Sequence, residues 1–417
     1  MKKKLISCIS LVIIFALCLC MTASAIAFDC PVDVSSDAAV LLNLEDNTVV
    51  FERNYTNARY LSNLSDIMTT MIVIKNVPNP EDARVEIKRS FFGYQQVNSY
   101  LTPYIDKTLS VLDLLYILML TGDRYSALIL ADYVSKGNTN DFVDLMNKRA
   151  VELGCEKTHF SSPAATDSDT QYTTCRDFVR IILNAFTSDL FKEIYVAKSY
   201  VPSGYDEEDH LIITTDSLAI STSPYYFKYT LGGKFGKDAT SGTNLVATFQ
   251  YSKIRYLFIG FGAPNEAERN VYVDAKQLLS WAYTDLKSRK ILSSSAVLTT
   301  ANADSRWGTS TLELSAKNNI NKTMPENVSE KDISYQYSVP EKVSLPVFKG
   351  QNIGTVSVYY RQSFVGEYDL VSQTNKGVDM MSDIGDLMHD MYDNLLPVKS
   401  EDLTEETTQQ PATIPSE

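Results

Sequence analysis

Two apolar runs with a short polar turn between them form the first clear pattern in the chain. They lie within Ala38 to Arg53, and Glu45-Asp46-Asn47 separates them, which is typical of a β-hairpin. Apolar residues then recur at helical spacing from Asp66 to Lys75. A similar pattern runs from Leu109 to Tyr133, with a break at Gly122-Asp123-Arg124. The pattern predicts a hairpin, a buried helix and then two consecutive helices.

The next segments continue this mixture of helices and strands. Amphipathic helices are predicted from Asn140 to Leu153 and from Cys175 to Phe186, and a long helix from Asp274 to Lys287. Strands are predicted from Asn244 to Phe249 and from Tyr256 to Gly262. Helices gathered between the terminal strands of one antiparallel sheet indicate an α+β domain, which we expect to cover residues 28–292.

After Leu292 the chain changes to short β-type runs with polar turns that contain Pro or Gly, so a small all-β domain is expected over residues 293–378. The runs are Ser295 to Thr300, Thr309 to Ser315, Ile333 to Val339, Val343 to Val347, Thr355 to Tyr360 and Val365 to Val371.

Both ends of the chain carry segments of a different kind. Residues 1–27 combine three lysines, an apolar run and the small-residue pattern Ala25-Ile26-Ala27, as secretory signal peptides do. An uncleaved membrane anchor is the alternative. In residues 379–417 an amphipathic helix is predicted from Met381 to Leu396, followed by an acidic disordered tail.

Composition narrows the classes of function. The chain has 417 residues, of which 44% are hydrophobic and 21% charged, as expected for a globular protein of about two domains. The formal charge is −13, and it would become −16 if cleavage removed the three leader lysines. No basic face is evident, so we expect no nucleic-acid partner, and a strongly acidic wall polymer would be repelled.

Cysteine and histidine are too sparse for several kinds of site. Outside the leader only Cys30, Cys155 and Cys175 remain, and their spacing fits neither a metal clip nor a disulfide framework. The three histidines lie far apart in the sequence, which disfavours a zinc site and a Ser-His-Asp triad. We therefore expect no metal and no cofactor, while the disulfide state of the three cysteines stays open.

Several stretches together resemble one family, the low-molecular-weight penicillin-binding proteins that act as D-alanyl-D-alanine carboxypeptidases. The resemblance implies the transpeptidase fold of penicillin-binding proteins and β-lactamases, an antiparallel sheet flanked by helices, followed by a small all-β domain. The stretches that carry it are Leu41 to Asn54, Arg59 to Thr70, Leu114 to Asp132, Phe142 to Phe160, Tyr172 to Asp177, Gly232 to Ala247 and Asp274 to Ala282.

The first catalytic motif of that family, Ser-x-x-Lys, is altered in this chain. The resemblance places Asn63 at the nucleophilic serine and Asp66 at the lysine that activates it. An amide is no nucleophile, and an anion cannot replace that cation. Ser62 and Ser65 lie close by, but neither has a lysine three residues later, and we expect them to face solvent or to cap a helix.

The other two motifs are altered as well. The Ser-x-Asn motif corresponds to Gly122-Asp123-Arg124, so both of its side chains differ. The Lys-Thr-Gly motif corresponds to Lys234-Phe235-Gly236, in which a ring replaces the hydroxyl that would hold a substrate carboxylate. Lys234 and Arg124 remain as candidates for ligand binding. A change in the flanking loop, Ser162 to Thr166, also suggests a rebuilt cleft.

The new residues predict an interaction of their own. If Asp66, Arg124 and Lys234 converge as the motifs do, we expect Asp66 to form an ion pair with Arg124 or Lys234 that fills the former active site. A solvated cluster of unpaired charges is the alternative.

These observations predict an exported cell-wall protein that is inactive as an enzyme by the chemistry of its motifs and that binds a peptidoglycan stem peptide or a wall-synthesis partner. Two alternatives remain: an active serine-type carboxypeptidase that trims the terminal D-alanine of the pentapeptide, and a purely structural exported protein. The acidic polar face of Met381 to Leu396 leaves peripheral membrane contact and docking on protein equally open.

Overall fold

The computed structural model describes residues 28–93, 98–164, 170–238, 242–305 and 308–377. The expected signal peptide and the helix from Met381 to Leu396 lie outside these ranges and stay predictions. Across the described ranges no helix combines the length and apolar content needed to cross a bilayer.

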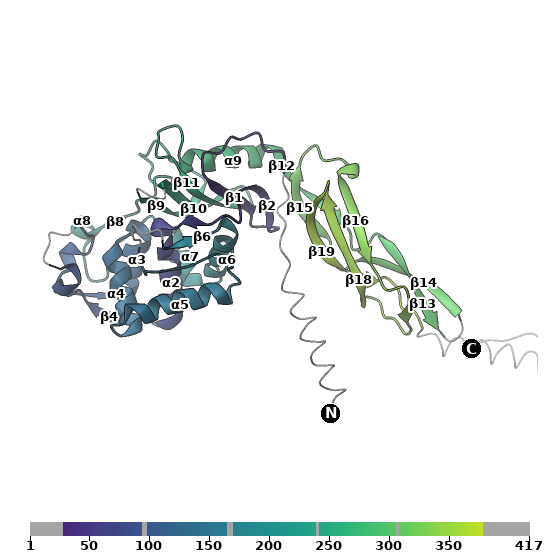
Figure 1. Cartoon of the computed structure of the whole chain (residues 1–417), viewed down its shortest axis with the longest axis horizontal. Helices are drawn as coiled ribbons and strands as arrows, with labels where there is room; N and C mark the ends of the chain where they lie inside the picture. Colours follow the sequence, from purple (N-terminus) through teal and green to yellow (C-terminus); the bar gives the residue numbers. More distant parts are fainter. Residues whose placement is uncertain (1–27, 94–97, 165–169, 239–241, 306–307, 378–417) are drawn as a thin grey trace, which may run out of the picture. The chain divides into compact units, whose positions relative to one another are not determined.

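A five-stranded antiparallel sheet forms the centre of the larger part of the structure (Figure 1). The predicted hairpin is confirmed, and its first strand pairs with a strand more than two hundred residues later, with Ala38 opposite Phe261. The order is β2-β1-β11-β10-β9, which leaves β2 and β9 at the edges. The strands are β1 (Ala38–Asn43), β2 (Thr48–Arg53), β9 (Thr230–Asp238), β10 (Gly242–Tyr251) and β11 (Ile254–Ala263).

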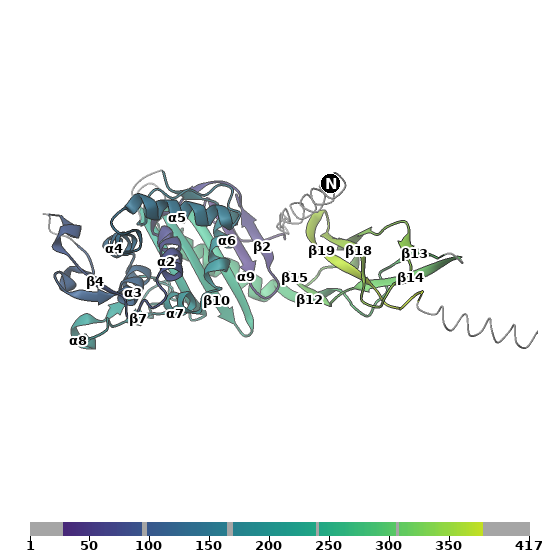
Figure 2. The ribbon, with the colours of Figure 1, turned by 90° about the horizontal axis from the view of Figure 1, so that it is seen from below.

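Helices cover both faces of this sheet. Figures 1 and 2 place α9 on one face and α2, α5, α6 and α7 on the other. The helices expected between Asp66 and Lys287 are all present, whereas α7 and the short α8 were not foreseen. The helices are α2 (Ser65–Asn76), α3 (Val111–Thr121), α4 (Arg124–Ser135), α5 (Thr139–Glu152), α6 (Cys175–Ala185), α7 (Asp189–Val196), α8 (Glu207–His210) and α9 (Val271–Asp285).

The helix α2 is the central element of the helical layer, because it contacts α3, α4, α5, α6 and α7. Eight of its twelve residues are buried, and they include the polar residues Ser65, Asp66, Thr69 and Thr70. A helix that is buried on nearly all sides normally carries apolar residues all round. The polar residues at the start of α2 therefore need partners from neighbouring elements.

Short elements connect the main ones. They are β3 (Arg59–Tyr60), the 3-10 helix η1 (Ser62–Leu64), β4 (Arg84–Glu86), η2 (Arg89–Phe92), η3 (Thr102–Tyr104), β5 (Thr108–Ser110), β6 (Tyr172–Thr173), β7 (Ser199–Tyr200) and β8 (Ile212–Ile213).

The C-terminal part of the described chain is built from strands, as expected. A six-stranded sheet has the order β16-β18-β19-β14-β13-β17, and β12 pairs with β15 in a separate ribbon. These strands are β12 (Leu286–Leu292), β13 (Thr299–Ser305), β14 (Gly308–Ala316), β15 (Ile320–Pro325), β16 (Ile333–Ser338), β17 (Val343–Ser344), β18 (Asn352–Tyr360) and β19 (Ser363–Ser372), with the 3-10 helix η4 (Glu330–Asp332) before β16. The fold class, an α+β domain followed by an all-β domain, is confirmed.

Several boundaries differ from the expected ones, and strand pairing explains two of them. The long helix ends at Asp285 rather than Lys287, because Leu286 already pairs with Pro325 as the first residue of β12. The strand expected from Ser295 to Thr300 lies at Thr299–Ser305, where pairing with β14 determines its position. The first partner is distant in sequence and the second follows soon after, but local periodicity gives the pairing register in neither case.

The described residues divide into two compact units. The larger contains residues 28–292, 319–336 and 357–367, and the smaller contains residues 293–318, 337–356 and 368–377. The chain thus leaves the larger unit after Leu292 and returns to it twice. The expected domain boundary between residues 292 and 293 stays a prediction.

Candidate functional site

The candidate site begins at the turn that leads into α2. Leu61 and Leu64 are fully buried and fix this turn in the core, and η1 passes directly into α2 at Ser65. Asn63 is half-buried, whereas Asp66 in the first turn of α2 is only 1% exposed. A buried carboxylate at this point requires a cation or several hydrogen-bond donors.

Lys234 supplies that cation. It lies on β9, is 3% exposed, and places its Nζ 2.9 Å from Oδ2 of Asp66. The expected ion pair is therefore confirmed for Lys234. It is not formed by Arg124, which is exposed and lies over the ring of Tyr125, with its guanidinium carbon 5.9 Å from the ring centre.

The end of α3 completes the surroundings of the lysine. Nζ of Lys234 donates hydrogen bonds to the carbonyls of Leu118 and Met119, at 2.7 and 3.2 Å. Both carbonyls belong to the last turn of α3, the end of a helix that carries partial negative charge, and the carbonyl of Leu118 also accepts a hydrogen bond from the backbone nitrogen of Gly122. The ammonium group therefore has three acceptors around its three protons and little reason to bind a ligand.

Burial dominates the electrostatics of Asp66. It raises the pKa of this carboxyl to about 6, against the opposing effect of the nearby Lys234 ammonium, and the carboxylate of Asp123 raises it further. The charged form of Asp66 is thus favoured by its partner but penalised by the loss of water.

Asn63 and Gly122 fit each other closely. Gly122 ends α3 in the left-handed conformation, with φ of 72°, and a Cβ at this position would lie 2.6 Å from Nδ2 of Asn63. The same Cβ would lie 3.6 Å from Nζ of Lys234. The asparagine amide therefore occupies the space that any side chain at position 122 would need, a serine included.

The strand β9 approaches the same turn from the other side. A Cβ at Gly236 would lie 2.9 Å from Oγ of Ser62 and 3.0 Å from the backbone nitrogen of Asn63. Only glycine allows the strand to pass so close to the turn. Phe235, the preceding residue, stacks on Tyr272 of α9 with ring centres 5.0 Å apart. Successive strand residues face opposite sides, so Lys234 points to α2 and Phe235 to α9.

Ser62 and Ser65 differ from expectation. Both are buried rather than solvent-facing, and neither side chain caps the N-terminus of a helix, although Ser65 is the C-cap residue of η1. Ser65 donates its hydroxyl to the carbonyl of Ser62, whereas Oγ of Ser62 has no hydrogen-bond partner. Ser62 also has φ of 49°, which is uncommon for a residue other than glycine and stores strain at this turn.

Asp123, the middle residue of the second motif, was not singled out in the sequence. Asp123 caps α4 through the backbone nitrogen of Ser126, and its other oxygen accepts hydrogen bonds from Oγ of Ser99 and the backbone nitrogen of Tyr100. An aspartate three residues before Ser126, at the start of an apolar helix, is a recognisable N-cap signal. Nothing in the local sequence indicates that the carboxylate of Asp123 also contacts residues 99 and 100.

The remaining sequence candidates contribute little to this site. Pro163 accepts a hydrogen bond from Thr69 and Ala164 one from Gln171, while residues 165 and 166 of the flanking loop lie outside the described ranges. Cys30, Cys155 and Cys175 are free thiols in the structure. Among the described residues no cluster of His, Cys, Asp and Glu could hold a metal ion.

Comparison with known proteins identifies the family. The family model described as D-alanyl-D-alanine carboxypeptidase matches residues 23–265, more than half of the chain. The chain belongs to the D-alanyl-D-alanine carboxypeptidase family. A second model, the C-terminal domain of penicillin-binding protein 5, matches residues 287–376 of this carboxypeptidase-family chain.

Individual relatives are distant but extend over most of the chain. The D-alanyl-D-alanine carboxypeptidase DacA of Haemophilus influenzae is 24% identical over 365 residues, which cover 85% of this chain and 87% of that protein. The DacF protein of Bacillus subtilis is 21% identical over 329 residues, covering 76% and 80%.

Solved structures share the fold. Penicillin-binding protein 5 from Haemophilus influenzae superposes with a TM-score of 0.64 at 21% identity, covering 84% of this chain and 99% of that one. A peptidoglycan synthesis regulatory factor from Streptococcus pneumoniae gives a TM-score of 0.60 at 14% identity, covering 82% and 100%. At such identities the likeness concerns the fold alone.

Removal of either member of the buried ion pair should destabilise the protein strongly. Asp66→Ala or Lys234→Met alone is expected to lower the free energy of unfolding by about 3 to 5 kcal/mol, because each leaves an uncompensated buried charge. The double variant Asp66→Leu, Lys234→Met should lose much less than the sum, since no charge remains. Denaturant unfolding at pH 7.5 measures all three. The exposed Lys237→Met on the same strand is the control, with an expected change within about 0.5 kcal/mol. If the double variant lost as much free energy of unfolding as the two single variants together, Asp66 and Lys234 would not be coupled.

The raised pKa of Asp66 predicts a pH effect of defined sign. The folded protein binds this proton more tightly than the unfolded chain, so the contribution of Asp66 to stability is full below about pH 4 and is lost as the pH rises through about 6. Between pH 7.5 and pH 5 the wild type should therefore gain about 1 kcal/mol relative to Asp66→Asn. Unfolding of both proteins at the two pH values tests this. Asp216, whose pKa burial also raises to about 6, is common to both proteins and cancels in the difference. A constant difference, or one that shrinks at pH 5, would rule the effect out.

Proposed function

We propose that this member of the carboxypeptidase family is a non-catalytic, extracytoplasmic cell-wall protein that binds a peptidoglycan stem peptide or a wall-synthesis partner. The observation that carries the proposal is the contact between Asp66 and Lys234 at 2.9 Å, beneath the position where the family motif would place its serine. Asp66 stands at the position of the activating lysine of the family. It holds Lys234, the lysine that remains from the third motif, in a buried ion pair.

The chemistry of acyl transfer supports this proposal. A serine nucleophile needs a neighbouring base that removes its proton and donors that stabilise the oxyanion. Asn63 offers an amide in the place of the hydroxyl. The lysine that could act as a base, Lys234, already donates to two carbonyls and contacts a carboxylate. Lys234 is therefore not free to act as that base.

The closed packing of the motif region also supports a loss of activity. Asn63 fills the space beside Gly122, and Ser62 fills the space beside Gly236. A substrate peptide that entered between these residues would have to displace buried side chains. Binding of a wall ligand is therefore proposed for other surfaces of the protein or for the rim of this cleft, where Arg124 is exposed.

The hydroxyl of Ser62 allows the alternative, an active serine-type carboxypeptidase, to be tested. Oγ of Ser62 is buried beside Asn63 without a hydrogen-bond partner, at a residue whose backbone is strained. Strain of this kind accumulates at functional turns. If the protein were an active carboxypeptidase, Ser62 would be the nearest candidate nucleophile to the position of the altered motif.

Reaction with a fluorescent penicillin tests the absence of a nucleophile. The purified mature protein should take up no covalent label at pH 7.5, because an amide at position 63 cannot form an acyl-enzyme. The DacA protein of Haemophilus influenzae, labelled in parallel, is the positive control. Covalent label on this protein would overturn the proposal, and its loss in Ser62→Ala but not in Ser65→Ala would then identify the nucleophile.

Co-sedimentation with purified peptidoglycan tests the binding role. The protein should sediment with intact wall, and removal of the stem peptides with an amidase should reduce the bound fraction at least about tenfold, since the glycan alone lacks the proposed ligand. Lysozyme digestion of the wall before sedimentation is the control for simple trapping. Absence from the pellet in every case would exclude the wall peptide as ligand and favour a structural role.

A further inference from the structure

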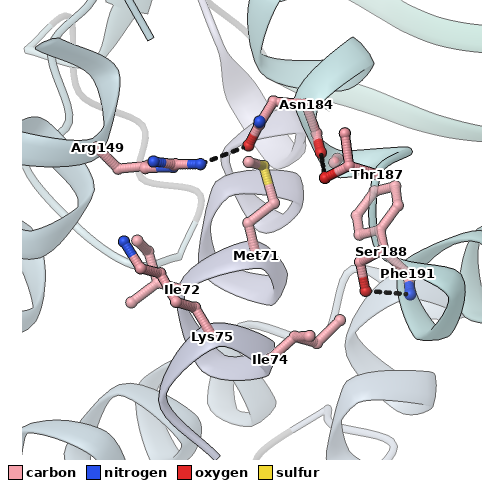
Figure 3. A pocket seen from close by; sticks show the side chains of 10 residues that line it. Met71, Ile72, Ile74, Lys75, Arg149, Asn184, Thr187, Ser188 and Phe191 are labelled. Atoms are coloured by element: carbon pink, nitrogen blue, oxygen red, sulfur yellow. Dashed lines mark hydrogen bonds between the residues drawn. The ribbon is translucent and has the colours of Figure 1, made fainter. Parts of the chain in front are cut away.

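A cavity of about 200 Å³ lies away from the altered motifs, at the opposite end of α2 (Figure 3). Four helices surround it: the C-terminal half of α2, the end of α5, the end of α6 and the start of α7. None of the residues of the altered motifs lines it. The residues that do are Met71, Ile72, Ile74, Lys75, Arg149, Asn184, Ala185, Thr187, Ser188 and Phe191.

One side of the cavity is apolar. Ile72 and Phe191 are buried at its base, while Met71 and Ile74 are only half-buried and so leave part of their apolar surface to the cavity. Figure 3 shows the Met71 side chain pointing toward Asn184 in the middle of the lining residues. Apolar surface of this kind favours the displacement of water by an apolar group.

The other side is cationic and held in place. Arg149 donates through Nη2 to Oδ1 of Asn184 at 2.7 Å and through Nη1 to Glu152 at 2.8 Å. Two of its five N–H donors are thus used, and they fix the plane of the guanidinium. Lys75 is 59% exposed along its side chain, and its Nζ lies 3.7 Å from the same carboxylate of Glu152.

The balance of charge at this point differs from that of the whole protein. Two cations share one carboxylate, and the hydrogen bond from Arg149 lowers the pKa of Glu152, so that carboxylate is ionised at neutral pH. One positive charge therefore remains beside the cavity, although the chain as a whole carries −13. Hydroxyl groups of Thr187 and Ser188 lie on the same rim.

We propose that this cavity binds a carboxylate joined to a compact apolar group, either as a free small acid or as the C-terminal residue of a peptide. The apolar group lies against the half-buried Met71 and Ile74, and the carboxylate lies toward Arg149 and Lys75. A planar guanidinium pairs well with a carboxylate, so the charged end of the ligand faces Arg149 and its apolar end faces the other side of the cavity.

The size of the cavity limits the ligand. An apolar cavity of about 150 Å³ is sufficient for benzene. A volume of about 200 Å³ therefore accommodates one six-membered ring or a branched aliphatic group with a short substituent. Phenylacetate has this size and charge, and phenylacetamide is its uncharged counterpart of the same shape.

Calorimetric titration of the full mature protein with these two probes tests the proposal. Phenylacetate should bind saturably, and phenylacetamide at least about tenfold more weakly, because it lacks the charge that meets Arg149 and Lys75. Acetyl-glycyl-phenylalanine with a free C-terminus distinguishes the two sources of the carboxylate. Tighter binding than phenylacetate assigns the site to peptide ends, and equal or weaker binding assigns it to free acids.

Variants locate the binding in this cavity. Arg149→Gln should weaken phenylacetate about tenfold, and Met71→Trp should abolish binding by filling the cavity. Lys148→Gln, an exposed cation on the same helix that does not line the cavity, should leave the affinity unchanged. Thermal unfolding of each variant establishes that it is folded. No saturable binding of any probe, or full binding by Met71→Trp, would overturn the proposal. The penicillin and wall experiments do not depend on this outcome.

Discussion

The contact between Asp66 and Lys234 organises the core of the larger unit. It joins the start of α2 to the edge strand β9, and the same ammonium group holds the last carbonyls of α3. Three elements that are distant in sequence thus meet at one buried charge. An ion pair without water is stable only when further hydrogen bonds satisfy both partners, and here the helix end supplies them for the lysine.

The same arrangement explains how the fold is kept although the residues at the motif positions differ from those of the family. The resemblance to the family implies a lysine at position 66 and therefore two cations in this space. With an aspartate there, the remaining cation is neutralised from within the protein. The surrounding glycines are needed for packing as well, since Gly122 and Gly236 leave room for Asn63 and Ser62.

Much of the fold could be predicted from the sequence, and the reasons for the remainder are physical. The hairpin, the helix beginning near Asp66 and the two helices around Gly122 have strong local periodicity and were found. The strands β12 and β15 were missed because their position depends on pairing with each other, between residues that are 28 to 39 positions apart. For the site, the resemblance to the family was sufficient to place Asp66 near Lys234. It could not show that Arg124 points to solvent, that Ser62 is buried, or that four helices enclose a cavity beside Arg149, because these depend on side-chain packing in three dimensions.

The fit between Asn63 and Gly122 has a consequence for descent within the family. A Cβ at position 122 would lie 2.6 Å from Nδ2 of Asn63, and its residue would have to keep the left-handed φ of 72°. A side chain at position 122 therefore requires the amide of Asn63 to move away. The two positions are expected to vary together among related chains, whatever chemistry the protein retains.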